Sequence, residues 1–106
     1  MADYGRTNEE VMKTFQDLVF ERHRIAIDSL PDYKDAKQAI LDLDNGYGVS
    51  VLIGRCFYSN GIDTYEVAVM KGDSICYSTP ITDDVIGRLT TEQVSDIMKQ
   101  IQELKD

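Results

Sequence analysis

The stretch QAILDLDNGYGVSV, residues 38–51, predicts a β-hairpin, because two runs of alternating apolar residues flank the turn residues Asp44-Asn45-Gly46. A three-residue loop with a left-handed glycine in third position is a common hairpin connection. In this register the cross-strand pairs are Leu43–Tyr47, Leu41–Val49 and Ala39–Val51, and all six side chains share one face. A two-residue loop would set Asp42 opposite Val49 and send polar groups into the core. Residues 38–43 alone also fit a short helix, but the turn favours the strand.

A second hairpin is predicted around Ser59-Asn60-Gly61, which again has glycine in third position. The pairs expected from this loop are Arg55–Tyr65, Ile53–Val67 and Val51–Val69. Near Lys71-Gly72-Asp73, loops of two and three residues both remain open. The core face of the last strand therefore carries either Ile75 and Tyr77 or Cys76 and Ser78. The result is a four-stranded antiparallel meander over residues 38–78.

Helices are expected before and after this meander in the sequence. After a loose leader (residues 1–6), Thr7 and Glu10 form a capping box for a long helix over residues 8–29. Thr90 and Gln93 form a second capping box, for an amphipathic helix over residues 91–105. The apolar stripe of that helix consists of Val94, Ile97, Met98, Ile101 and Leu104.

A short helical segment is also expected to start at Thr82-Asp83-Asp84 and to stop at Gly87. The predicted fold class is α+β, a single domain over residues 1–106. Both long helices pack on the apolar face of the sheet.

Composition limits the classes of protein that this chain can belong to. Its 106 residues, 42% hydrophobic, suit one core, and no apolar run is long enough to span a membrane. The N-terminus does not resemble a signal peptide, so the expected location is the cytoplasm. A net charge of −8 argues against direct nucleic-acid binding, which requires a basic surface. Cys56 and Cys76 are expected about 10 Å apart with a strand between them, too far for a disulfide.

The sequence offers no pattern for catalysis, metal binding or cofactor binding. His23 is the only histidine, so neither a nucleophilic triad nor a zinc site can be assembled in the usual way. The acid pair Asp83-Asp84 lacks the alternating oxygen ligands of a calcium loop. Gly46 and Gly48 precede a strand, whereas a phosphate-binding loop precedes a helix. A non-enzymatic protein with no cofactor and no metal is therefore expected.

Three segments resemble a family of small proteins encoded by bacteriophages and prophages. The segments are NGYGVSV (45–51), YEVAV (65–69) and CYSTPITDDVIGRLT (76–90), and the likeness covers about residues 38–105. The resemblance implies a phage accessory protein that acts in the cytoplasm of the bacterial host. Such small acidic proteins often inhibit host machinery, as anti-CRISPR and other counter-defence proteins do.

Two functional hypotheses follow. In the first, the chain binds and modulates a host protein, one whose basic nucleic-acid-binding groove would suit an acidic surface. The candidate partner-binding residues are Asp83, Asp84, Tyr58 and Met70. In the second, an oligomer such as a homodimer binds or sequesters a small ligand on the second sheet face. Gly48, Ser50 and Gly54 would leave room there, and Leu52, Tyr58 and Met70 would line it.

Overall fold

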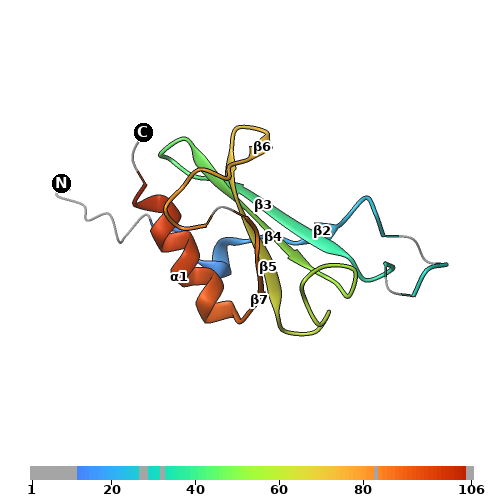
Figure 1. Cartoon of the computed structure of the whole chain (residues 1–106). Helices are drawn as coiled ribbons and strands as arrows, with labels where there is room; N and C mark the ends of the chain where they lie inside the picture. The colour runs from blue at the N-terminus through green and yellow to red at the C-terminus, as the bar shows by residue number, and fades with distance from the viewer. Residues whose placement is uncertain (1–11, 27–28, 32, 83, 105–106) are drawn as a thin grey trace.

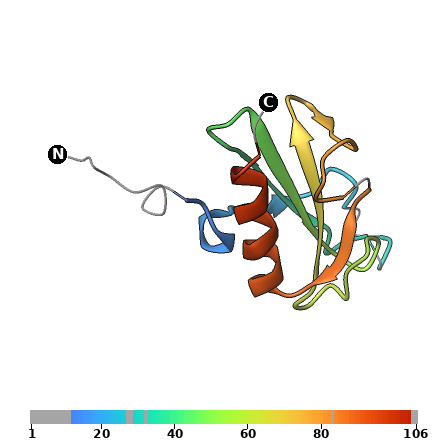
Figure 2. The ribbon, with the colours of Figure 1, turned by 60° about the vertical axis from the view of Figure 1, so that its left-hand side comes forward.

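The computed structural model describes residues 12–26, 29–31, 33–82 and 84–104, which form an antiparallel sheet with one helix packed on one face (Figures 1 and 2). The elements are η2 (Phe15–Asp17), β2 (Glu21–Arg22), β3 (Lys37–Asp42), β4 (Tyr47–Ile53), β5 (Tyr65–Lys71), β6 (Ser74–Ile75), β7 (Ile86–Leu89) and α1 (Thr91–Gln102). The strand order is β2-β3-β4-β5-β6, and β7 also pairs with β5. The α+β class with an antiparallel sheet is confirmed.

The first hairpin, β3–β4, has the predicted register. Leu41 pairs with Val49 and Ala39 with Val51, and the Leu43 amide donates a 2.8 Å hydrogen bond to the Tyr47 carbonyl. Gly46 has φ 89°, the left-handed conformation that the three-residue loop requires. Residues 38–42 are strand, so the helical alternative is wrong.

The register predicted for the second hairpin, β4–β5, is wrong by two residues. Val51 pairs with Val67, and Val49 with Val69. A shift of two leaves every side chain on its expected face, which is why alternation alone did not detect the error. Strand β4 ends at Ile53, and residues 54–64 form a long loop that side-chain hydrogen bonds of Ser59 and Asn60 hold together.

The third turn is the two-residue loop Gly72-Asp73, with Lys71 paired to Ser74. The Cys76 amide donates a 2.7 Å hydrogen bond to the Val69 carbonyl, and Cys76 packs against the core, whereas Ile75 and Tyr77 are exposed. No disulfide joins Cys56 and Cys76. Cys56 lies in the loop after β4 and Cys76 follows β6, so neither lies in a strand as predicted.

Helix α1 confirms the predicted C-terminal amphipathic helix. The Thr90 hydroxyl accepts from the Gln93 amide, and the Gln93 side chain accepts from the Thr90 amide. The helix ends at Gln102, three residues earlier than predicted. Its stripe meets the sheet in a core formed by Val49, Val51, Val67, Val69, Val94, Met98 and Ile101, all at most 1% exposed, with Leu43 and Leu89.

The long N-terminal helix predicted over residues 8–29 is wrong over residues 12–26, which contain only η2 and β2. The Thr14 hydroxyl accepts from the Gln16 amide, and the Asp17 carboxylate accepts from the Thr14 amide, which closes a single 3-10 turn. The chain then extends at Leu18, and β2 pairs with β3. Sheet pairing and burial of aromatic rings therefore override a helical spacing pattern. The predicted Thr7–Glu10 capping box lies outside the described residues.

The helix start predicted at Thr82 is also wrong. The Thr82 hydroxyl accepts from the Asp84 amide in a local turn, and the chain then forms strand β7. Because β6 covers only the last two residues of β5, the rest of that edge is free to pair with β7, which brings Ile86 and Leu89 against the core. The sheet thus has more strands than the predicted four.

Gly87, predicted only to stop a short helix, lies in β7 against Tyr58. A Cβ atom on Gly87 would lie 2.4 Å from the Tyr58 Cβ atom, closer than two carbon atoms can approach. We expect Gly87→Ala to lower the free energy of unfolding by about 1–3 kcal/mol, measured by chemical denaturation. Part of this loss should return in the double variant with Tyr58→Ala. A wild-type midpoint for Gly87→Ala would contradict this packing.

Candidate functional site

The sequence-predicted site residues lie on different segments of the chain. Met70 is half-buried on the sheet face away from α1, whereas Tyr58 lies in the loop after β4, where its amide donates to the Glu66 carboxylate. Glu66 and Met70 share a face of β5 but are four residues apart, about 13 Å. Asp84 is exposed in the loop before β7, and Asp83 lies outside the described residues.

The sheet face opposite α1 is an open surface with a small-residue floor. Gly48, Ser50 and Ala68 are buried, and the Gln38 amide donates a 3.0 Å hydrogen bond to the Ser50 hydroxyl. Ile40, on the same face, is 58% exposed. The small residues of this face are therefore buried, whereas its larger residue Ile40 is exposed.

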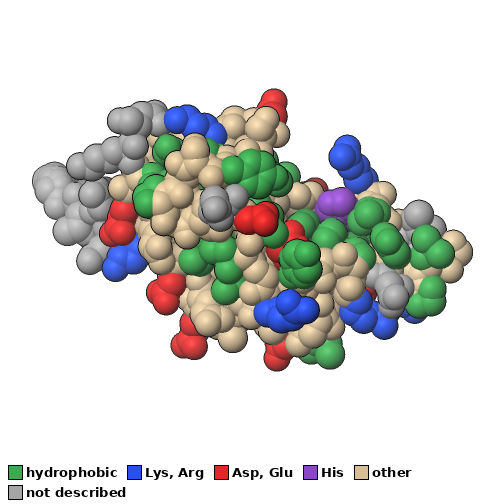
Figure 3. All heavy atoms as spheres, viewed as in Figure 1, with side chains coloured by type: hydrophobic (Ala, Val, Ile, Leu, Met, Phe, Trp, Pro, Cys, Tyr) green, Lys and Arg blue, Asp and Glu red, His purple; other side chains and the backbone are tan. Residues whose placement is uncertain are grey.

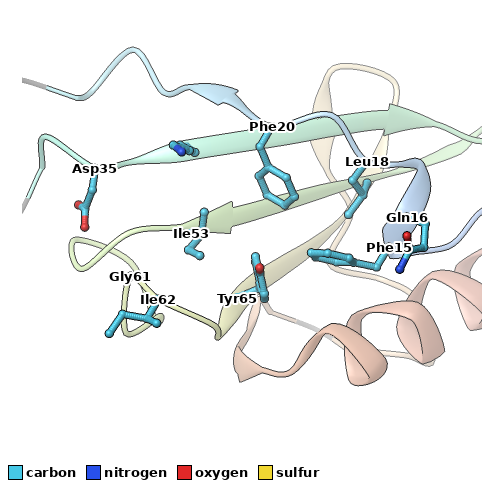
Figure 4. A pocket seen from close by; sticks show the side chains of 10 residues that line it. Phe15, Gln16, Leu18, Phe20, Asp35, Ile53, Gly61, Ile62 and Tyr65 are labelled. Carbon is cyan, nitrogen blue, oxygen red and sulfur yellow. The ribbon is translucent and has the colours of Figure 1, made fainter.

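A deeper site lies at the end of the core face that α1 leaves uncovered. A cavity of about 450 Å³ opens there, which we call the aromatic groove. Its lining residues are Phe15, Gln16, Leu18, Phe20, Asp35, Lys37, Ile53, Gly61, Ile62 and Tyr65. Figure 4 shows the rings of Phe15, Phe20 and Tyr65 turned toward one another, with Ile53 between them and Asp35.

Three aromatic rings form the inner wall of the groove. The Phe15 and Tyr65 rings meet edge to face with centroids 5.0 Å apart, and Phe20 lies 5.7 Å from Tyr65 and 5.9 Å from Phe15. Such contacts stabilise by about 0.5–1.5 kcal/mol per pair beyond simple burial. The rings are only partly buried, so the cluster presents apolar surface to the groove.

Hydrogen bonds to α1 fix the segment that carries Phe15. The Phe15 amide donates to the Ser95 hydroxyl at 3.0 Å. The Lys13 backbone is bound in both directions by the Gln102 side-chain amide, at 2.7 and 2.8 Å. These bonds join residues about 80–90 positions apart in the sequence and hold one wall of the groove rigidly against the helix.

The opposite wall is the 54–64 loop, which presents Ile62 to solvent. The Asn60 carboxamide oxygen accepts from the amides of Ile62, Asp63 and Thr64 at 2.8–3.1 Å. Gly61 has φ 77°, a conformation that suits glycine. These contacts hold Ile62 80% exposed at the mouth of the groove. Ile62 therefore adds an exposed apolar side chain to the lining of the groove.

Polar groups stand at the outer end of the groove. The Asp35 carboxylate lies 3.4 Å from the Arg55 guanidinium, yet its Oδ1 atom is buried and has no hydrogen-bond partner. Burial raises the pKa of Tyr65, and the negative charge of Asp63 raises it further, so the phenol stays neutral and able to donate. The groove therefore combines an apolar floor with a few oriented polar groups, as binding sites commonly do.

A second cavity, of about 530 Å³, adjoins the groove across Phe15 and Gln16. Its other lining residues are Thr91, Glu92, Ser95 and Asp96, from the first turns of α1. In Figure 3, acidic side chains (red) are visible on the left-hand part of the molecule, where α1 lies, and basic side chains (blue) are visible on both the left and the right. One apolar and one acidic cavity thus share a wall.

Within the described part of the chain, no group of three or more His, Cys, Asp or Glu side chains is arranged to hold a metal ion. None of the described helices has the length and hydropathy needed to cross a membrane. No protein-family model, curated protein or solved structure matches the chain.

The groove was missed by sequence reasoning because its wall was assigned to a helix. Phe15 and Phe20 are five residues apart, a spacing that a regular helix places on different sides. In the structure, a 3-10 turn followed by extended chain brings both rings to Tyr65. Exposed Ile62 next to the turn residues Asn60-Gly61 was the available signal, because turn chemistry alone does not require an isoleucine there.

His23 gives a pH-dependent contribution to this end of the fold. Its Nδ1 atom accepts from the Ile25 amide at 3.0 Å and its ring meets Phe57 edge to face. Burial lowers the pKa of His23 below 6.5, and Arg24 lowers it further. Because the unfolded chain then binds more protons than the folded chain below pH 6.5, the stabilisation by neutral His23 is full above pH 6.5 and falls as the pH drops toward the folded pKa.

Between pH 7.5 and pH 5.5, we expect the melting temperature of wild type to fall more than that of His23→Gln. Equal decreases would contradict the lowered pKa.

Proposed function

We propose that this chain is a non-enzymatic protein-binding module that docks a segment of a partner protein in the aromatic groove. The observation that supports this most is the groove itself: three half-buried rings, exposed Ile62 and rigid walls on both sides. Tyrosine and other aromatic side chains in well-packed pockets dominate the energetics of protein interfaces. A pre-organised groove keeps the entropic cost of docking low.

The setting that we propose comes from the resemblance to phage and prophage proteins. In that setting the module binds and modulates a host protein in the bacterial cytoplasm and acts as a counter-defence inhibitor of the anti-CRISPR kind. A stoichiometric inhibitor needs a surface and no reacting groups, which agrees with the proposed docking mode. The small-ligand alternative has less support, because a small ligand requires a cavity that buries most of its surface, whereas Ile40 on the second sheet face is 58% exposed.

Photo-crosslinking in host cells tests this proposal. The unnatural residue p-benzoylphenylalanine would replace Ile62 at the groove mouth or, as the control, Ile40 on the opposite face; both positions are largely exposed. We expect a discrete protein adduct from position 62 that excess wild-type protein competes away, and no such adduct from position 40. An adduct from position 40 alone would move the binding surface to the other sheet face and refute the proposal.

A further inference from the structure

We propose that the partner segment spans both cavities, with a bulky apolar side chain in the aromatic groove and basic side chains against Glu92 and Asp96. This inference rests on the proposed function and adds the chemistry of the occupant. The two cavities share a wall, because Phe15 and Gln16 line both of them. A segment anchored in one therefore continues directly into the other.

The Asp35 end of the aromatic groove and the second cavity differ in charge. In the groove, the Asp35 carboxylate is already paired with Arg55 at 3.4 Å, and Lys37 lines the same end, so this end offers no net negative charge. The second cavity has two carboxylates, Glu92 and Asp96, and no basic residue among its lining residues. Basic groups of a partner are therefore attracted to the α1 end and not to the Asp35 end.

Solvent exposure and net charge strengthen this orientation. Glu92 and Asp96 are both exposed, so they can meet a partner without first losing a protein contact. The whole chain carries a net charge of −8, which raises the association rate of a positively charged segment at low ionic strength.

The apolar anchor is defined by the groove. Its rings of Phe15, Phe20 and Tyr65 stand on one side and Ile62 on the other, over a floor that includes Ile53. A tryptophan or another large aromatic side chain fills such a space and keeps edge-to-face contact with the rings. The occupant is thus a protein segment that carries a large aromatic residue followed or preceded by lysine or arginine.

Peptide titrations of the full chain test this occupant. The probes are two acetylated, amidated pentapeptides, each with one tryptophan, two glycines and two lysines. In one peptide the lysines precede the tryptophan, and in the other they follow it. Matched probes carry glutamate for lysine or alanine for tryptophan. We expect only the probes with tryptophan and lysine to shift the amide NMR signals of Phe15, Gln16, Tyr65 and Glu92.

Neutralising Glu92 and Asp96 tests whether their charges contribute to the affinity for the probe. We expect Glu92→Gln combined with Asp96→Asn to weaken the tryptophan–lysine probe about fivefold, since each exposed ion pair contributes modestly. Asp42→Asn, an exposed acid of β3 beyond the groove, is the matched control and should leave the affinity unchanged.

The outcomes distinguish the two proposals. If the glutamate probe binds the groove as well as the lysine probe, or if neutralisation changes nothing, the basic occupant is refuted while the groove remains a docking site. If no tryptophan probe shifts the groove signals at millimolar concentration, the aromatic anchor is refuted. In that case the crosslinking experiment still decides the proposed function independently.

Discussion

Val67→Asp is expected to unfold the domain. Val67 is 0% exposed between the sheet and α1, and it pairs with Val51, which is also fully buried. A carboxylate at this position would have no partner, and an unpaired buried charge costs more than about 4 kcal/mol. Small domains are stable by only about 5–15 kcal/mol, and the idealised cost of an isolated buried carboxylate, on the order of tens of kcal/mol, exceeds that range.

Met70→Asp is the matched control, three residues further along the same strand. Because neighbouring residues of a strand alternate between faces, Met70 lies on the open sheet face, where it is only half-buried. A carboxylate there reaches water, so we expect a cost of about 1 kcal/mol. Circular dichroism melts of both variants measure the difference. Equal costs would contradict the assignment of the two faces.

The parts of the fold that local rules determine were predicted correctly from the sequence. The β3–β4 hairpin follows from alternation and a left-handed glycine, and α1 follows from its capping box and apolar stripe. Each of these two patterns is formed by residues that are close to one another in the sequence. The side-chain faces of β4 and β5 were also predicted, although their register was not.

The errors arise where distant segments compete for the same residues. Residues 12–26 carry a helical spacing, yet the free edge of β3 and the contact of Phe15 and Phe20 with Tyr65 determine their conformation. Strand β7 forms for a similar reason, since β5 has an unfilled edge beyond β6. No window of local sequence contains this information, and the aromatic groove depends on it entirely.

The second large effect is expected on binding and not on stability. Ile62→Asn removes the exposed apolar side chain at the groove mouth but leaves the Asn60 contacts, which involve only the backbone of residue 62. We expect the affinity for the crosslinked host protein to fall about tenfold or more, as for central residues of other interfaces. The melting temperature should stay near that of wild type, since exposed substitutions cost within about 0.5 kcal/mol.

The most direct test is therefore the ratio of two dissociation constants, measured by calorimetry with the purified partner. The two variants are Ile62→Asn and Ile40→Asn, which replace exposed isoleucines on opposite sides of the sheet. Docking in the aromatic groove predicts that the dissociation constant of Ile62→Asn is about ten or more times that of Ile40→Asn, with both variants folded. A ratio near one, or a larger loss for Ile40→Asn, would contradict docking in the groove.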